Sequence, residues 1–314
     1  MKILITGAAG FIGSHLSEYL CQKGHEVIGL DNLSSYYDVA LKQDNINSIT
    51  ANGVRFVKAD LRDINQYQNL GDDFDFIYHL AAQPGISKDS TFESYLENNV
   101  VATKTLIEFT KTQKQLKHFF YISTSSVYGK FATVSEEVSP QPISTYGITK
   151  LAAEQMILSE SRQQHFKASS FRLYSVYGPR ERPDKLFTKL IHSALNDLKF
   201  PLFQGSLKHE RSYTFVGDIV KGLSKTIKLY NTLDGEIINL GHDQKYTTQE
   251  GVTIVENLLN KTIDFEIFPP RAGDQQQTQA IIKKAKQLLD YQPTTTFKEG
   301  IKQQINWYKS KMHN

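Results

Sequence analysis

Short apolar segments alternate with longer amphipathic segments through the first half of the chain. The apolar runs have the length and composition of buried strands and cover residues 3–5, 26–30, 54–57, 76–80, 118–123 and 169–174. Between them, apolar residues recur at helical spacing over residues 13–23, 94–112 and 145–163. This alternation predicts an α/β fold, a Rossmann-type doubly wound parallel sheet with helices on both faces.

Beyond residue 178 the alternation is lost, and prolines divide the chain into shorter pieces. We therefore predict a first domain over residues 1–176 and a smaller mixed α/β domain over 177–314 that supplies the substrate pocket. A segment near 214–240 is expected to return to the first domain. Residues 297–311 have the pattern of a closing amphipathic helix, and the polar run 275–279 is expected to be a surface loop.

Composition narrows the class of protein further. The chain has 314 residues, of which 39% are hydrophobic and 22% charged, so it is not disordered. The net charge of +3, without blocks of like charge, gives no indication of a nucleic-acid or membrane partner. Cys21 is the single cysteine, so neither an internal disulfide nor a thiolate metal cluster can form. No apolar run approaches the ~20 residues of a membrane helix. We expect a cytoplasmic enzyme without a metal.

A glycine-rich loop follows the first predicted strand and opens a helix. Residues 6–13 read TGAAGFIG, with Gly7, Gly10 and Gly13 where a dinucleotide pyrophosphate meets a helix N-terminus. Phe11 and Ile12 lie in the same loop. Asp31 ends the second strand, where an acid accepts hydrogen bonds from the adenosine ribose. Its carboxylate would repel a 2′-phosphate, and the adjoining Asn32 offers no positive charge, which favours NAD over NADP.

The ends of the next two strands add candidate cofactor contacts. Asp60 and Leu61 follow the third strand, and residues 80–83 (LAAQ) follow the fourth. Because ligands bind at the carboxyl ends of parallel strands, Asp60 is placed to contact the adenine. Small side chains at Ala81 and Ala82 would let a cofactor lie against the backbone. Turn formation and close packing explain the same residues equally well.

A tyrosine and a lysine stand one helical turn apart in residues 146–150 (YGITK). Tyrosine, with an ordinary pKa near ~10, is a poor base at neutral pH, and a neighbouring cation lowers that pKa. The spacing alone is weak evidence, because Tyr19 and Lys23 share it. Tyr146 and Lys150 differ in following residues 122–129 (ISTSSVYG), which place hydroxyl groups at the end of the fifth strand. We interpret this combination as a catalytic site.

At this point the sequence resembles the extended short-chain dehydrogenase/reductases that act on nucleotide sugars. The resemblance covers essentially the whole chain. Besides the glycine loop it rests on YHLAAQPG (78–85), NNVVAT (98–103), STSSVYG (123–129), YGITK (146–150), RLYSVYGPRERPD (172–184), RSYTFVGDIV (211–220) and PRAGD (270–274).

The resemblance implies bound NAD that is used catalytically, with roles for named residues. Tyr146 would remove the proton of the sugar O4 hydroxyl, Lys150 would hold the nicotinamide ribose, and Thr124 would hydrogen-bond O4. The cofactor would be bound by Gly7, Gly10, Phe11, Ile12, Gly13, Asp31, Asn32, Asp60, Leu61, Leu80, Ala81, Ala82, Gln83, Asn99, Tyr146, Lys150 and Tyr174. The substrate would be bound by Ser125, Ser126, Ser175, Arg182, Phe203, Arg211, Arg271 and Asp274.

The residues after Thr124 select among the reactions of the family. Dehydratase relatives carry Asp-Glu there and decarboxylase relatives carry Ser-Glu, whereas this chain has Ser125-Ser126. Without an acid or base at these positions, elimination lacks its general catalyst. The resemblance therefore implies C4 epimerisation through a transient 4-keto sugar.

The substrate most favoured by the resemblance is UDP-glucuronate, with UDP-galacturonate as the product. VYGPRERPD (176–184) resembles the UDP-glucuronate 4-epimerase group, and hydroxyls of residues 124–126 and Ser175 suit a carboxylate. Oxidation at C4 would give a β-keto acid, which can lose carbon dioxide once its C5–C6 bond aligns with the ketone. A fixed set of hydrogen bonds to the carboxylate would prevent this alignment.

Departures from the group pattern leave other sugars open. An arginine common after Gly-Val is missing from residues 85–88 (GISK), so Lys88 would have to compensate the uronate charge. Thr278 is small at a position that gates N-acetyl acceptance. The alternatives are a UDP-glucose or UDP-N-acetylglucosamine 4-epimerase, an NADH-consuming C4 reductase, and a redox-sensing protein without turnover. Homodimerisation through the helices of 94–112 and 145–163 is expected by family analogy alone.

Overall fold

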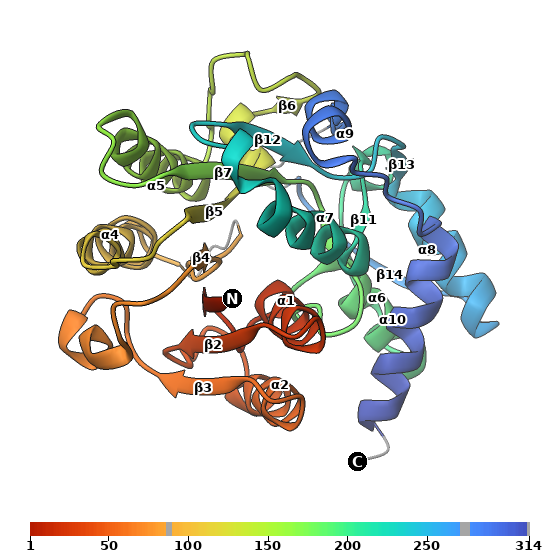
Figure 1. Ribbon diagram of the computed structural model, residues 1–314. Helices are drawn as coiled ribbons and strands as arrows, with labels where there is room; N and C mark the ends of the chain where they lie inside the picture. The colour runs from red at the N-terminus through yellow and green to blue at the C-terminus, as the bar shows by residue number, and fades with distance from the viewer. Residues whose placement is uncertain (86–89, 271–276, 313–314) are drawn as a thin grey trace.

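A seven-stranded parallel sheet forms the centre of the computed structural model, which describes residues 1–85, 90–270 and 277–312 (Figure 1). In spatial order its strands are β12 (Ile237–Leu240), β7 (Ala168–Leu173), β5 (His118–Thr124), β4 (Phe76–His79), β1 (Lys2–Thr6), β2 (Glu26–Asp31) and β3 (Arg55–Lys58). Every pairing in this sheet is parallel. The order reverses at β1, where a doubly wound sheet opens a crevice for ligands.

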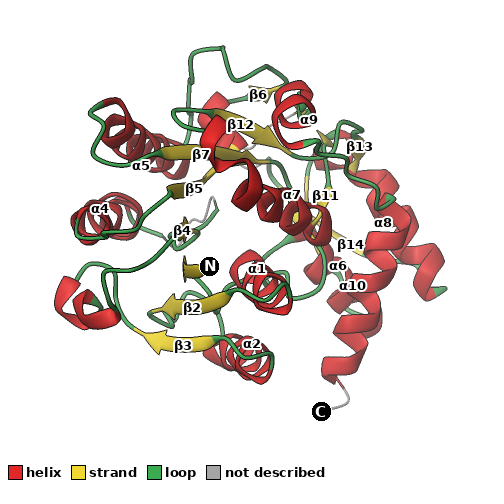
Figure 2. Cartoon of the chain, in the orientation of Figure 1, coloured by secondary structure: helices red, strands yellow, loops and turns green. Residues whose placement is uncertain are grey.

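Helices cover both faces of this sheet, as Figures 1 and 2 show. One face carries α1 (Phe11–Gln22), α2 (Val39–Ala51) and α7 (Val216–Leu229). The other carries α4 (Ala102–Lys111) and α5 (Thr145–Arg162), and α3 (Phe92–Tyr95) runs into α4 through the π-helical segment Leu96–Val101. The Rossmann-type α/β fold predicted from the apolar pattern is confirmed.

Short elements make up the rest of the molecule. Its helices are α6 (Leu186–Leu195), α8 (Thr248–Leu259), α9 (Lys283–Leu289) and α10 (Phe297–Met312). Its small sheets join β6 (Phe131–Ala132), β10 (Glu210–Arg211), β13 (Tyr246–Thr247) and β15 (Gln277–Thr278); β8 (Val176–Tyr177) and β11 (Thr214–Phe215); and β9 (Phe200–Phe203) and β14 (Phe265–Phe268). Single 3-10 turns are Ile64–Gln66, Gln68–Leu70, η4 (Ser125–Tyr128), Ser206–Lys208 and Tyr230–Thr232.

The two parts of the chain share one apolar core. A cluster of buried side chains runs from the α1 and α7 face of the sheet into the smaller part, where Phe187, Tyr213 and Phe297 pack ring against ring. Strand β12 pairs with β7, so residues 237–240 lie in the large sheet although they follow the first elements of the smaller part. The exact limits of the two domains stay a prediction.

The prediction of a surface loop over residues 275–279 is wrong for residues 277 and 278, which the structure describes as a strand. Gln277 and Thr278 form β15, and Thr278 is fully buried. The polar groups of this strand find hydrogen-bond partners inside the protein: its backbone pairs with β6, and the Ser212 backbone N–H lies 3.4 Å from Thr278 Oγ1. No helix in the described part of the chain has the length and apolar character needed to cross a bilayer.

Candidate active site

A cavity of about 1130 Å³ lies at the carboxyl ends of the central strands, between the large sheet and the smaller part. Its walls come from the glycine loop, from the ends of β2, β4 and β5, from the start of α5, and from the segment before α6. Among the described residues, no group of His, Cys, Asp or Glu is arranged to hold a metal ion.

The glycine loop leaves backbone exposed where an anion would bind. Gly7 adopts φ +72°, and a Cβ atom there would lie 2.8 Å from the Ala81 nitrogen. A Cβ on Gly13 would lie 2.1 Å from the Gly7 oxygen. Gly10 precedes α1 without a side-chain cap, so the first N–H groups of the helix face the cavity. Gly7, Gly10, Phe11, Ile12 and Gly13 all line it.

Asp31 is held rigidly at the end of β2, with 8% of its surface exposed. It accepts hydrogen bonds from the backbone N–H groups of Ala9 (3.2 Å) and Leu33 (2.8 Å). Burial raises the pKa of its carboxyl, while the Lys42 ammonium counteracts that rise. Lys42 lies on α2 and donates to the Ser34 carbonyl at 2.8 Å. The sequence analysis missed it, although a lysine one helix away from a ribose-binding acid was a visible signal.

Asp60 and Asn32 line the cavity beside Leu61, but their side chains bind each other. Asn32 Nδ2 donates to Asp60 at 3.2 Å, and Arg62 donates through Nε (2.9 Å) and Nη2 (2.7 Å). These bonds lower the pKa of Asp60 to about 2. Asp60 therefore stays charged and fixes the turn after β3.

Two predicted cofactor contacts do not reach the cavity. Asn99 is 1% exposed and lies behind residues 80–83, which do line it. It binds the backbone of Gln83 and the Thr149 hydroxyl, so it shapes the cofactor wall from outside. Tyr174 is fully buried, because its side chain packs against Gly241 behind the end of β7. Both residues lie behind the residues that line the cavity, and their contact with the cofactor stays a prediction.

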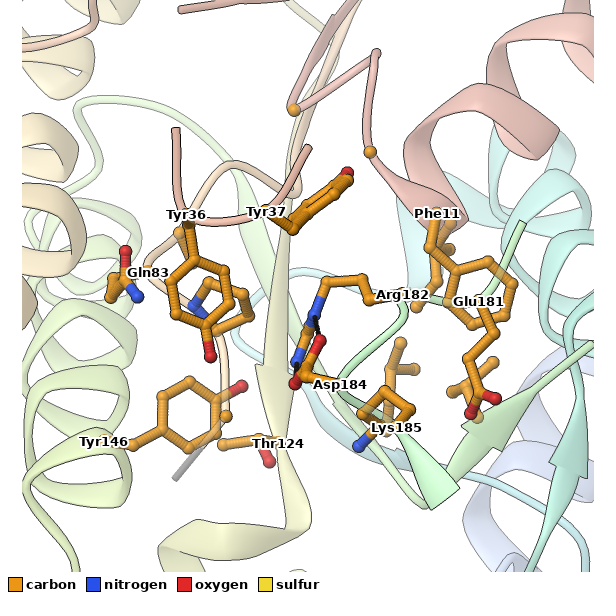
Figure 3. A pocket seen from close by; sticks show the side chains of 18 of the residues that line it. Phe11, Tyr36, Tyr37, Gln83, Thr124, Tyr146, Glu181, Arg182, Asp184 and Lys185 are labelled. Atoms are coloured by element: carbon orange, nitrogen blue, oxygen red, sulfur yellow. Dashed lines mark hydrogen bonds and ion pairs between the residues drawn. The ribbon is translucent and has the colours of Figure 1, made fainter. Parts of the chain in front are cut away.

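Thr124, Tyr146 and Lys150 line the same cavity, and Figure 3 shows the side chains of Thr124 and Tyr146 close to each other. Thr124 ends β5 and caps η4, accepting the Ser126 N–H at 3.1 Å, and Tyr146 opens α5 after the cap Ser144. Burial raises the pKa of Tyr146, and the hydrogen bond with Thr124 and the nearby Arg182 charge oppose that rise.

Lys150 is buried under the catalytic face of α5. Its ammonium donates to the Ile122 carbonyl at 2.6 Å and lies 4.2 Å from the centre of the Tyr121 ring. Burial lowers its pKa to about 7, and the Glu154 carboxylate opposes this. Lys150 therefore lies one helical turn from Tyr146, with its ammonium fixed against β5.

The predicted substrate residues that the structure describes gather around the same cavity. Ser125, Ser126, Ser175, Arg182, Phe203 and Arg211 all line the cavity. Arg182 pairs with Asp184 through two bonds of 2.9 and 3.0 Å, and its guanidinium lies 5.7 Å from the Tyr36 ring centre. Arg271, Asp274 and Lys88 lie outside the described residues.

Several lining residues were not predicted. Tyr36 and Tyr37 enter from the loop after β2, and Glu181, Asp184 and Lys185 enter from the segment before α6 (Figure 3). Burial lowers the pKa of the Lys185 ammonium, and the neighbouring positive charge of Arg182 lowers it further. A signal was present in the prolines of residues 179–183, which predicted an irregular segment beside the site.

The fold and the site together define an enzyme of the extended short-chain dehydrogenase class with a dinucleotide cofactor. Residues 3–241 match the model of the NAD dependent epimerase/dehydratase family. Two curated relatives cover nearly all of this chain. A protein named Uncharacterized UDP-glucose epimerase YtcB, from Bacillus subtilis, is 36% identical over 99% of this chain and 98% of its own length. UDP-glucuronate 4-epimerase 3 of Arabidopsis thaliana is 32% identical over 98% of this chain and 76% of its own.

A solved structure extends the likeness to three dimensions. UDP-glucuronic acid 4-epimerase from Bacillus cereus, in complex with UDP-glucuronic acid and NAD, superposes with a TM-score of 0.94 at 34% identity, covering 99% of each chain. This chain belongs to the NAD dependent epimerase/dehydratase family. Its cofactor is NAD, which fits the uncapped α1 terminus, the glycine loop without room for side chains, and the fixed Asp31 carboxylate.

Proposed function

We propose that this protein is a UDP-sugar 4-epimerase that interconverts UDP-glucuronate and UDP-galacturonate. The observation that carries the proposal is the convergence of Thr124, Tyr146 and Lys150 on one cavity wall, with Ser125 and Ser126 rather than acids beside Thr124. The solved relative that binds UDP-glucuronic acid and NAD supports the same reaction.

The chain's own groups account for proton transfer at O4. Tyr146, as the phenolate, accepts the O4 proton, and Thr124 holds O4 through its hydroxyl. Arg182 and Thr124 favour the phenolate, because one brings positive charge and the other a hydrogen bond. When bound, NAD supplies reversible acceptance of hydride at C4. Once the 4-keto sugar has turned over in the cavity, the hydride returns to the opposite face of C4, and return of the proton from Tyr146 to O4 completes the inverted sugar.

The serines beside Thr124 support epimerisation over elimination. Removal of the C6 group or of a C5 proton needs a general acid and a base next to Thr124. Ser125 and Ser126 supply neither at neutral pH, but their hydroxyls can donate to a carboxylate. Together with Ser175, which also lines the cavity, they would fix the uronate group while C4 is oxidised.

The alternative is epimerisation of a neutral sugar, as the name of the Bacillus subtilis relative indicates. Thr278, which the resemblance associates with N-acetyl acceptance, is fully buried and does not line the cavity.

Product analysis on purified enzyme without added NAD tests the proposal. UDP-glucuronate, UDP-glucose and UDP-N-acetylglucosamine are offered separately, and the products are resolved by NMR. We expect UDP-galacturonate from the first substrate. Turnover of neutral sugars alone would overturn the uronate assignment, and a pentose with carbon dioxide would overturn the role of Ser126. Tyr146→Phe should remove turnover and leave NAD bound.

We also propose a homodimer formed through α4 and α5. Phe92 on α3 and Ile148 on α5 are 55% and 51% exposed, and α3 packs beside α5. Such apolar residues on neighbouring helices support an interface. Light scattering should give twice the chain mass, and Ile148→Asp should give the monomer. The cytoplasmic location stays a prediction.

A further inference from the structure

A buried ion pair lies directly behind the catalytic helix. Arg172 on β7 and Glu154 on α5 have 1% and 0% of their side chains exposed. Arg172 donates to Glu154 through Nη2 at 2.6 Å and through Nε at 3.1 Å, and Ser170 Oγ donates to the same carboxylate at 2.8 Å.

Stability alone does not account for this pair. Desolvating two charges costs about as much as their attraction returns, and apolar residues of similar size often serve as well. Arg172 Nη1 is also buried without a hydrogen-bond partner among the described residues, which adds a further cost. Because burial of the Arg172–Glu154 ion pair gives little net stabilisation, we look for its role in its effect on neighbouring groups.

Glu154 faces the catalytic lysine. Tyr146, Lys150 and Glu154 are spaced four residues apart and therefore share one face of α5. Tyr121 on β5 and His79 on β4 also lie near the ammonium. Burial lowers the pKa of His79 to about 3, so this histidine is neutral. Of the titratable groups that act on Lys150, Glu154 is the one that stabilises its charge.

Arg172 reaches the turn that carries the hydroxyl groups. Its guanidinium carbon lies 4.7 Å from the centre of the Tyr128 ring, and Tyr128 is the last residue of η4. The Tyr128 hydroxyl donates to Asn239 Oδ1 on β12 at 2.8 Å. One guanidinium thus joins the helix of Tyr146 and Lys150 to the turn after Thr124.

We propose that Glu154 and Arg172 are positioning residues for the reaction. Glu154 holds Lys150 in its charged form, and Arg172 fixes Glu154 while packing the turn that carries Ser125 and Ser126. The relevance of this arrangement to turnover rests on the proposed epimerase function. The effect on Lys150 itself does not, because it is a property of the folded chain.

The test replaces the pair by apolar residues in the double variant Glu154→Leu/Arg172→Met. Circular dichroism and thermal melting check that the variant folds. The ionisation of Lys150 is followed by NMR of protein with ¹³Cε-labelled lysine, with the signal assigned through Lys150→Met. Without the carboxylate the ammonium is less stable, so Lys150 should lose its proton at a pH lower by about one unit or more.

Turnover is measured on the same variant across pH. The alkaline limb of kcat should move to lower pH together with the Lys150 titration. A merely structural role would lower kcat at every pH and leave the limb in place. An unmoved Lys150 titration would overturn the inference.

Two further variants keep the outcome decisive. Glu154→Gln removes the charge at nearly constant size. If the double variant fails to fold, the NMR titration of Lys150 and the pH dependence of kcat are measured on Glu154→Gln instead. Glu160→Gln is the matched control, because Glu160 lies on the same helix and binds Lys111 and His165 instead. It should leave the Lys150 titration unchanged. If the wild-type protein converts no UDP-sugar, the proposed function fails, and the NMR titration still decides this inference.

Discussion

Asn99 binds both backbone groups of Gln83: its Oδ1 accepts the Gln83 N–H at 2.7 Å and its Nδ2 donates to the Gln83 carbonyl at 3.3 Å. Its amide also donates to the Thr149 hydroxyl at 3.0 Å. Gln83 follows β4 on the wall of the cavity, and Thr149 lies between the catalytic tyrosine and lysine in sequence. One buried amide therefore connects the cofactor wall to the catalytic helix.

Asn99→Ala should weaken both the fold and the cofactor site. The substitution leaves the Gln83 N–H buried without its partner, which costs about 1–3 kcal/mol. We expect a lower melting temperature and less NAD copurifying with the protein. Asn196→Ala is the control, because Asn196 bonds only His192 among the described contacts and is not one of the residues that line the cavity. Full NAD content in Asn99→Ala would contradict the supporting role.

Gly13→Ala should disrupt the pyrophosphate end of the cavity. The new Cβ would lie 2.1 Å from the Gly7 oxygen and 2.8 Å from the Gly7 carbonyl carbon, so the loop or the helix has to shift. We expect an NAD affinity lower by about tenfold or more, measured by calorimetry on NAD-free protein. Gly24→Ala is the comparison: Gly24 has open space around it but φ +83°, so it should lose some stability and retain NAD. Equal NAD affinity in both variants would be evidence against a tight loop.

Those parts of the fold that depend on local pattern could be predicted from the sequence. The strands at residues 2–6 and 118–124 contain the continuous apolar runs 3–5 and 119–122. Helix α5 begins one residue after Ser144, whose side chain accepts the Gly147 N–H at 3.1 Å. Periodicity and capping are encoded within a few residues of each element.

Contacts that depend on distant partners could not be predicted in this way. The sequence predicts that Asn99 contacts the cofactor. In the structure its hydrogen-bond partner Gln83 lies between Asn99 and the cavity. Asp60 is predicted to contact the adenine, and only the structure shows that its carboxylate is bound by Asn32, 28 residues away in sequence, as well as by the neighbouring Arg62. The entry of Lys185 into the cavity likewise depends on where α6 packs.

Ser126→Glu should discriminate between charged and neutral sugars. Ser126 lines the cavity in the turn that Thr124 caps, so a carboxylate there would face the uronate group. Like charges at about 4 Å repel by a few kcal/mol near a protein surface. We expect KM for UDP-glucuronate to rise about tenfold or more. Ser126→Gln is the uncharged control of similar size, and an equal rise in both variants would indicate a steric effect instead.

Lys150→Met should stabilise the NAD-free protein while it inactivates the enzyme. Burial holds the pKa of Lys150 at about 7 in the folded chain, against the usual 10.5. Because the folded pKa is depressed, the unfolded chain binds the proton more tightly. The charge therefore destabilises the fold fully below about pH 7, and this penalty fades as the pH rises toward 10.5.

Methionine fills similar space without a charge, so the variant should melt several degrees higher at about pH 6, and its advantage should shrink in alkaline buffer. Its kcat should fall by about a hundredfold or more, because the charge beside the catalytic tyrosine is lost. Lys104→Met, at an exposed position on α4, controls for the removal of a lysine and should change neither property. A melting temperature of Lys150→Met below that of the wild type at about pH 6 would contradict this prediction. It would show that the hydrogen bond from Lys150 to Ile122 stabilises the fold by more than burial of the charge destabilises it.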